Sequence, residues 1–144
     1  MSDSDLKAIA IYLKDQSGEK QSASSDPDEK TMKSGAEIYA DECSGCHTGN
    51  GKGIPNMFPS LNGSAVVQQT DPTSLLHVVL RGARSVGTAN APTAPAMPTF
   101  GWILKDDQIA DVLTYIRNSW GNSASAVDAA AVKTERQALV ERSD

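Results

Sequence analysis

Two cysteines and a histidine stand together in this sequence and are equipped for one kind of chemistry. Cys43 and Cys46 are the only cysteines of the chain, two residues separate them, and His47 follows directly. Each thiol can add across one vinyl group of a haem, and the adjoining imidazole is then placed to ligate the iron. Two intervening residues let the backbone turn so that both sulfurs reach one edge of the macrocycle. The pattern therefore predicts one covalently attached haem c, with His47 as its proximal iron ligand.

Three other interpretations of the cysteine pair explain less of the sequence. A redox dithiol of the thioredoxin type follows a buried strand, whereas residues 36–42 have a helical pattern. A zinc site needs further Cys or His ligands, and His77 is the only other histidine of the chain. A structural disulfide would leave the adjoining His47 without a role. Haem attachment is the interpretation that uses all three residues.

The sixth coordination position of such an iron either takes a second ligand or stays open. The side chains that can fill it are Met32, Met57, Met97 and His77. Met97 is favoured because prolines near it on both sides stiffen the backbone, and because the long segment 82–100 has little other reason to be ordered. His77 lies in an apolar, helix-like stretch and is interpreted as a helix-surface histidine. We therefore expect His47 and Met97 to be the two iron ligands.

Helices are expected to position these ligands. The spacing of apolar residues predicts helices over 32–41, 73–81 and 107–119, and a short one over 64–69. Aromatic residues make up only 5 % of the chain, which is little for a core of this size. A haem at the centre would supply the missing apolar volume. The expected fold is all-α, with three to four helices around one covalently bound haem.

Charge and hydropathy exclude some classes of partner. The net charge of -5 disfavours a nucleic-acid partner. No apolar run approaches the length of a transmembrane helix, so we expect no membrane insertion by this chain. No signal peptide or membrane anchor is found in these residues. Basic protein partners, or partners that are not selected by charge, are favoured instead.

The chain opens with a second copy of its last predicted helix. In the two copies, Leu6, Ile9, Ala10 and Leu13 correspond to Ile109, Val112, Leu113 and Ile116. We interpret residues 1–15 as the closing helix left over from a preceding haem domain. Such a helix would pack on the present domain, pair with a copy of itself, or fray. Self-association through residues 1–15 is therefore one of the expectations.

This interpretation divides the chain into four parts. Residues 1–15 are the leftover helix, and residues 16–30 are polar without periodic apolar positions, as is typical of a linker. Residues 31–122 form the haem domain. Residues 123–144 form an Ala-rich tail, which could make a loose helix but carries no residues that suggest chemistry.

Residues on two of the predicted helices add a family resemblance to the haem motif. Gly35 and Tyr39 stand on the first helix, and Val112 and Tyr115 stand on the last. With this pattern the stretch from Lys33 to Asn122 resembles a class I cytochrome c domain. The resemblance implies that the two helices cross, and that the missing side chain of Gly35 lets them approach closely.

The resemblance also implies roles for residues after the haem motif. Pro59 and Leu61 match a Pro-x-Leu element in which the proline carbonyl accepts a hydrogen bond from the proximal imidazole. Such a bond orients His47 and strengthens it as a donor to the metal. Met97 matches the sixth ligand of the family. The implied cofactor-binding set is Cys43, Cys46, His47, Pro59, Leu61 and Met97.

A narrower resemblance extends to the segments 49–64 and 97–122. They resemble the third haem domain of triple-haem cytochrome subunits that serve membrane-bound quinoprotein alcohol or aldehyde, flavin-dependent gluconate and related dehydrogenases. This implies a periplasmic electron-transfer protein, not an enzyme, that passes single electrons to quinone, another cytochrome or a terminal oxidase. A stand-alone soluble carrier, and a haem sensor or enzyme module with a displaceable sixth ligand, are the alternatives.

The resemblance does not specify which residues border the exposed haem edge or which residues bind the haem propionates. We expect the exposed haem edge to be bordered by uncharged residues, namely Ser44, Gly45, Met57, Phe58 and residues 94–98. The polar candidates for holding the propionates are Arg81, Arg84 and Trp102. Electron exchange is thus expected through an uncharged patch, with the acidic surroundings altering chiefly the rate of encounter.

Overall fold

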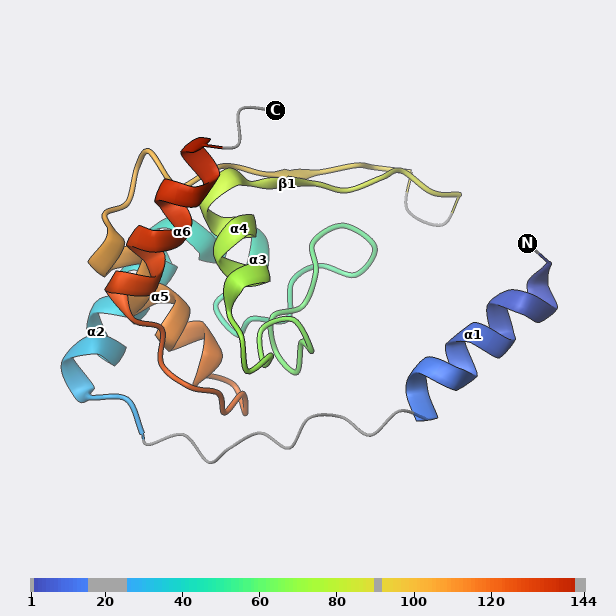
Figure 1. Cartoon of the computed structure of the whole chain (residues 1–144), viewed down its shortest axis with the longest axis horizontal. Coiled ribbons are helices and arrows are strands. Elements are labelled where there is room, and N and C mark those ends of the chain that lie inside the picture. Colours follow the sequence, from blue (N-terminus) through green and yellow to red (C-terminus); the bar gives the residue numbers. More distant parts are fainter. Residues whose placement is uncertain (1, 16–25, 90–91, 142–144) are drawn as a thin grey trace.

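The computed structural model describes residues 2–15, 26–89 and 92–141, and it is built mainly from helices (Figure 1). The helices are α1 (Asp3–Asp15), α2 (Glu29–Ile38), α3 (Ser44–His47), α4 (Thr73–Arg81), α5 (Asp106–Arg117) and α6 (Ala129–Glu141). A π-helical turn, η1 (Tyr39–Cys43), joins α2 to α3, and the short strands β1 (Ala83–Arg84) and β2 (Ala96–Met97) pair antiparallel. The helical class is confirmed, and the small sheet is an addition to the predicted fold.

One helical run carries the haem motif. Asp28 caps the start of α2, because its Oδ1 accepts a hydrogen bond from the backbone N–H of Thr31 at 3.0 Å. The run continues through η1 and α3 to His47, and Thr48 ends it with a φ of 63°. The apolar spacing predicted only the part 32–41, since the π turn interrupts the helical period. The motif is therefore held at the end of a helix that is anchored in the core.

Helix α5 crosses α2 at very short range. A Cβ atom on Gly35 would lie 2.3 Å from the carbonyl oxygen of Asp111 and 2.6 Å from Cβ of Tyr115, so a side chain has no room there. The rings of Tyr39 and Tyr115 pack with their centroids 5.6 Å apart. The apolar side chains that α5 buries are Ile109, Ala110, Val112, Leu113 and Ile116. This crossing, as the sequence predicted, forms one wall of the core.

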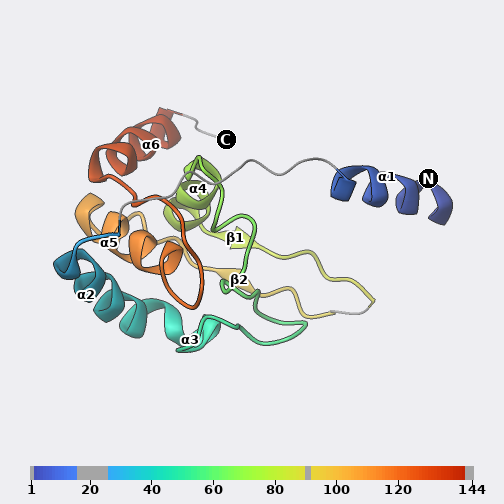
Figure 2. The same ribbon diagram turned by 90° about the horizontal axis from the view of Figure 1, so that it is seen from below.

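Helix α6 packs on both α4 and α5, as Figures 1 and 2 show. Its Val132 is fully buried, and the Nε atom of Arg136 lies 2.7 Å from the carboxylate of Asp106 at the start of α5. Glu135 lies 2.8 Å from Nε2 of His77 on α4, which is half-buried at the helix surface. The sequence predicts only a loose helix in the tail 123–144. The structure instead packs this segment against the domain.

The segment between α4 and α5 begins as a hairpin. Its two strands pair Ala83 with Met97 and Arg84 with Ala96. Gly82 ends α4 with a φ of 75°, and a Cβ atom there would lie 2.6 Å from the carbonyl oxygen of Met97. Glycine is therefore needed for the second strand to approach the end of α4. The hairpin fixes Met97 beside α4.

The short helix predicted over 64–69 is wrong. Residues 65–68 form a turn. The Nη1 atom of Arg117 donates to the carbonyl oxygens of Val67 and Gln69 at 2.8 and 2.9 Å. The guanidinium of Arg117, which comes from a distant part of the chain, thus holds this segment in a turn. The apolar spacing of the segment itself does not predict that conformation.

Helix α1 lies away from the packed helices in both views (Figures 1 and 2). Its start is a capping box: Asp5 accepts from the backbone N–H of Ser2 at 2.9 Å, and Ser2 Oγ accepts from the backbone N–H of Asp5 at 3.3 Å. Most of the linker expected over 16–30 lies outside the described residues. Among the helices that are described, none has the length and apolar content needed to cross a bilayer.

Candidate haem-binding site

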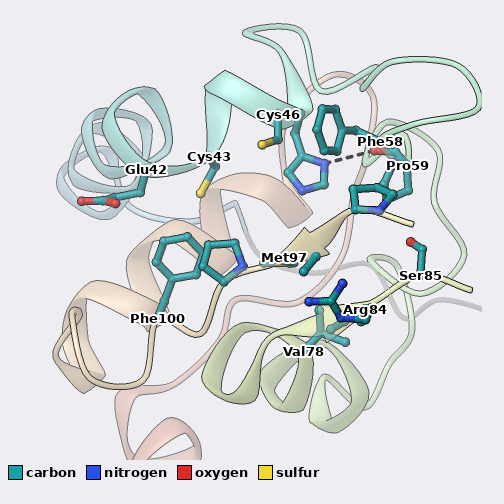
Figure 3. A pocket seen from close by; sticks show the side chains of 15 residues that line it. Glu42, Cys43, Cys46, Phe58, Pro59, Val78, Arg84, Ser85, Met97 and Phe100 are labelled. Atoms are coloured by element: carbon teal, nitrogen blue, oxygen red, sulfur yellow. Dashed lines mark hydrogen bonds between the residues drawn. The ribbon is translucent and has the colours of Figure 1, made fainter. Parts of the chain in front are cut away.

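An apolar cavity opens where the haem motif, the hairpin and helices α4 and α5 meet (Figure 3). It has two adjoining chambers of about 230 and 240 Å³. The residues that line both chambers are Cys43, His47, Pro59, Val78, Met97 and Phe100. The structure therefore brings the motif and Met97, which are 50 residues apart in sequence, to one cavity.

His47 is buried and has a fixed orientation. Its Nδ1 atom lies 3.0 Å from the carbonyl oxygen of Pro59, shown as a dashed line in Figure 3. With Nδ1 donating its proton to that carbonyl, Nε2 is the nitrogen with a free lone pair. The backbone N–H of Gly53 donates to the carbonyl oxygen of His47 at 2.9 Å, which closes the turn after the motif. The bond that the sequence led us to expect at Pro59 is thus present.

The two cysteines form no disulfide with each other, and both line the same cavity (Figure 3). Cys43 is half-buried and Cys46 is exposed. Burial raises the pKa of the Cys43 thiol to about 12, and the charges of Glu42 and Cys46 add to this. Such a thiol is a poor redox nucleophile at neutral pH. Within the described part of the chain, no three His, Cys, Asp or Glu side chains cluster to hold a metal ion.

Met97 is the one sixth-ligand candidate of the sequence that lines the described cavity. It is half-buried on β2 and borders both chambers. Met57 is 42 % exposed, and Met32 lies on α2 outside the residues that line the cavity. His77 contacts Glu135 instead. The geometry favours Met97 over the other candidates.

Other predicted site residues fall in different places. Leu61 is half-buried and lines one chamber, beside Pro59. Arg84 lines the other chamber, close to Met97 in Figure 3. Arg81 donates to the carbonyl oxygen of Leu139 on α6, and Trp102 is 79 % exposed and lies outside the lining. Of the three propionate candidates, Arg84 is the one placed at the cavity.

The cavity suits a haem by the chemistry of its lining. Its walls are mostly aliphatic and aromatic, as a porphyrin face requires, and two thiols stand on one side where covalent attachment would occur. An imidazole with a free Nε2 and a thioether supply the two kinds of axial ligand common in cytochromes c. The residues present therefore fit the group that the motif implies.

Comparison with known proteins also indicates a protein that binds haem. The model of the family described as cytochrome c matches residues 32–120. The chain belongs to the cytochrome c family. It is accordingly an electron-transfer protein with one covalently bound haem c, and it is not an enzyme.

Curated relatives of this cytochrome c include subunits of larger dehydrogenases. The chain is 40 % identical over 139 residues to the gluconate 2-dehydrogenase cytochrome c subunit of Pantoea cypripedii, covering 88 % of this chain and 31 % of that one. It is 41 % identical over 133 residues to the cytochrome c subunit of the quinone alcohol dehydrogenase of Gluconobacter oxydans strain 621H, covering 85 % and 28 %. The chain thus spans about a third of the length of these relatives.

A smaller relative matches a shorter part of this chain. Cytochrome c-552 of Thermus thermophilus is 37 % identical over 93 residues, which is 62 % of this chain and 70 % of that protein. The cytochrome c described here therefore resembles both a part of long subunits and a short cytochrome.

Sequence reasoning missed three buried polar residues, two of which hold the cavity walls. Arg117 and Asn122 are buried at and just beyond the end of α5, and both bind carbonyl groups of pocket-lining segments. Thr114 is fully buried and accepts a hydrogen bond from the backbone N–H of Val127 at 2.9 Å. Their only signal in the sequence is a polar residue next to apolar core positions. That signal does not name the partner.

Proposed function

We propose that this domain relays single electrons through a haem attached to Cys43 and Cys46 and ligated by His47 and Met97. The observation that carries the proposal is the shared cavity, which His47 and Met97 both line although they come from separate elements. The haem, when bound, supplies an iron that cycles between the ferric and ferrous states. With both axial positions taken, no site remains for a substrate. The proposed ligation thus favours electron transfer alone.

The residues of the chain would tune that haem. Pro59 holds the Nδ1 proton of His47 and so raises the donor strength of the imidazole. Leu61 and Phe100 contribute apolar surface that keeps water from the haem faces. The thioether of Met97 favours the reduced state relative to a second histidine. Arg84 lines one chamber of the cavity, which supports it as the partner of a propionate.

We infer that the electrons come from a dehydrogenase in the bacterial periplasm. The named relatives are cytochrome c subunits of dehydrogenases that act on gluconate and on alcohols, which supports a redox partner of this kind. Quinone, another cytochrome or a terminal oxidase would accept the electrons. The match to cytochrome c-552 over most of its length supports the second candidate, a carrier that works by itself.

The test of the ligation compares two methionines. Ferric iron bound by a thioether gives a weak near-infrared absorption band, so this band should be present in the parent protein and lost in Met97→Ala. Met57→Ala is the matched control, because Met57 is exposed and outside the cavity lining, and it should keep the band. A band that survives in Met97→Ala, or carbon monoxide binding by the reduced parent at neutral pH, would refute the proposed ligation.

We further propose that electrons pass through the uncharged patch formed by Ser44, Gly45, Met57, Phe58 and residues 94–98. Phe58 and Ala96 line the chamber next to the cysteines, which supports the patch as the rim of the haem edge. Transient redox contacts are small and gain little from buried ion pairs. A charge introduced into this rim should therefore slow electron exchange, while distant charges should affect only the encounter rate.

The patch is tested by changing the charge at two positions, one inside the patch and one outside it. Ala96→Glu should slow electron exchange with a redox partner without moving the haem spectrum. Asp107→Lys should change chiefly the dependence on ionic strength, because Asp107 is exposed at the start of α5. Asp106 is unsuitable for this control since it pairs with Arg136. Loss of transfer in Asp107→Lys with normal transfer in Ala96→Glu would instead establish electrostatic docking.

A further inference from the structure

We propose that Asn122 is a positioning residue for the proximal ligand, an inference that rests on the proposed ligation by His47. Asn122 follows α5 and is only 5 % exposed. Its Nδ2 donates to the carbonyl oxygens of Leu61 and Ile116 at 3.0 and 2.9 Å, and its Oδ1 accepts from the backbone N–H of Gly63 at 2.9 Å. One buried amide thus joins the end of α5 to the segment 61–63.

The segment that Asn122 holds is the continuation of the one that orients His47. Pro59, whose carbonyl oxygen accepts the Nδ1 proton of His47, stands two residues before Leu61. On its other side the segment is held by the carbonyl oxygen of Gly51, which accepts from the backbone N–H groups of Leu61 at 2.7 Å and Asn62 at 3.0 Å. The position of the Pro59 carbonyl therefore depends on two anchors, Gly51 and Asn122.

The turn that delivers Asn122 has an unusual backbone. Trp120 has a φ of 56° and Gly121 a φ of 90°, and the left-handed region is rare for a bulky residue such as tryptophan. A conformation of this kind persists only where the surroundings hold it. The Trp120 ring packs 5.0 Å from the ring of Tyr39, and a Cβ atom on Gly51 would lie 2.4 Å from it. The turn at Trp120 and Gly121 therefore contacts one anchor, Gly51, through the Trp120 ring, and it directly precedes the other anchor, Asn122.

Loss of the Asn122 amide would remove three hydrogen bonds, those to the carbonyl oxygens of Leu61 and Ile116 and the one from the backbone N–H of Gly63, and would loosen the Pro59 segment. The hydrogen bond from Nδ1 of His47 would then weaken. A weaker bond leaves less negative charge on the imidazole, so the ring stabilises ferric iron less well. The reduction potential should rise, and the Nδ1 proton should exchange faster with solvent.

The experiment compares two asparagines in the haem-loaded protein. Asn122→Leu removes the amide at nearly constant volume, and Asn118→Leu is the control, because Nδ2 of Asn118 donates to Thr114 within α5 itself. We expect the His47 ring proton to exchange about tenfold faster in Asn122→Leu, measured by NMR of the reduced protein. The reduction potential should shift to a more positive value. Asn118→Leu should match the parent in both measurements.

The outcomes separate this inference from the proposal beneath it. If the parent itself shows no haem-shifted resonance from the His47 ring, the proposed ligation fails. If the resonance is present, and Asn122→Leu is less stable but has the parent exchange rate and potential, Asn122 is merely structural and the inference is overturned. Should Asn122→Leu fail to accumulate with haem, Asn122→Ala leaves room for water beside the same groups and undergoes both measurements.

Discussion

Helices α1 and α5 have the same apolar spacing, and the structure gives them opposite surroundings. Ile109 of α5 is 0 % exposed, whereas Leu6, its counterpart on α1, is 48 % exposed, and the other matched positions differ in the same way. The cover of α5 is α2, which approaches it closely at Gly35. The apolar pattern of a helix therefore predicts which face is suited to burial. Whether that face is buried depends on a second element that packs against it.

The comparison of α1 with α5 also indicates what kind of element could cover the apolar face of α1. A helix with the pattern of α5 is suited to a partner like α2, with a small residue at the crossing point. The long dehydrogenase subunits align with 85–88 % of this chain and have about two thirds of their length beyond the match. We propose that α1 is covered by such a partner in a preceding haem domain, and self-association is the alternative.

The largest expected effect comes from blocking the cover of α5. Gly35→Val places a side chain where a Cβ atom already lies 2.3 Å from the carbonyl oxygen of Asp111, so α2 and α5 must separate. We expect the free energy of unfolding to fall by about 3 kcal/mol or more, measured by urea titration of the haem protein. Gly49→Ala is the control, since nothing lies within 4 Å of a Cβ there. Equal stability of the two variants would contradict the crossing.

A second prediction truncates one isoleucine on each of the two helices. Ile109→Ala should cost about 2–5 kcal/mol, because it leaves a cavity in the core. Ile9→Ala should change the free energy of unfolding by less than about 0.5 kcal/mol, as is usual at an exposed position. Both are measured by urea titration at several protein concentrations. A large, concentration-dependent loss in Ile9→Ala would show that α1 is covered by a second copy.

A third prediction compares a polar anchor on α5 with its counterpart on α1. Thr114→Val removes the acceptor of the buried Val127 N–H and should cost about 1–3 kcal/mol. Ile11 occupies the matching position of α1 and is exposed, so Ile11→Val should be nearly neutral. The measurement is again the free energy of unfolding. If Thr114→Val were neutral too, the contact would not contribute to holding the segment before α6.

The smallest effect concerns the carboxylates that cap α1 and α2. The hydrogen bond from the backbone N–H of Thr31 lowers the pKa of Asp28, and Ser2 lowers that of Asp5 in the same way. Each cap therefore stabilises its helix fully above the ordinary pKa of 3.8 and is lost as the pH falls through the lowered value.

Of these two caps, only the cap of α2 should contribute to the free energy of unfolding of the domain. Asp28→Ala should lower the free energy of unfolding at pH 7, and the difference from the parent should shrink as the pH falls below about 4. Asp5→Ala should leave global unfolding unchanged at either pH, because α1 lies away from the packed helices. A pH-independent loss in Asp28→Ala would mean that the charge of the cap is irrelevant.

Local signals in the sequence predicted the parts of the site that depend on neighbouring residues. The motif at Cys43 to His47 and the α4 bounds are predicted from a few adjacent or periodic residues, whereas the close approach at Gly35 is implied by the family resemblance. The structure agrees with the α4 bounds and with the approach at Gly35. The choice of Met97 rested on its flanking prolines and loop length, and the hairpin explains how it reaches the cavity.

The sequence could not predict features that depend on distant partners. The turn at 65–68 is held by Arg117, which lies about 50 residues later, and α6 is fixed by contacts to α4 and α5. In both cases the residues have ordinary patterns, and the decisive contact is made across the fold. Asn122 shows the same limit, since nothing beside it indicates that its amide binds segment 61–63.

The π turn η1 has a consequence for how the haem motif and the helix crossing are related. An α-helix rotates by about 100° per residue, so one additional residue in a turn changes the angular phase of everything that follows. Gly35 faces α5 before the turn, Tyr39 packs on Tyr115 of α5 at the first residue of the turn, and Cys46 and His47 face the cavity after it. The π turn therefore rotates the face that carries the haem motif, about the helix axis, relative to the face that packs on α5. Deleting one residue between Tyr39 and Cys43 would keep the crossing and rotate the attachment motif away from its cavity.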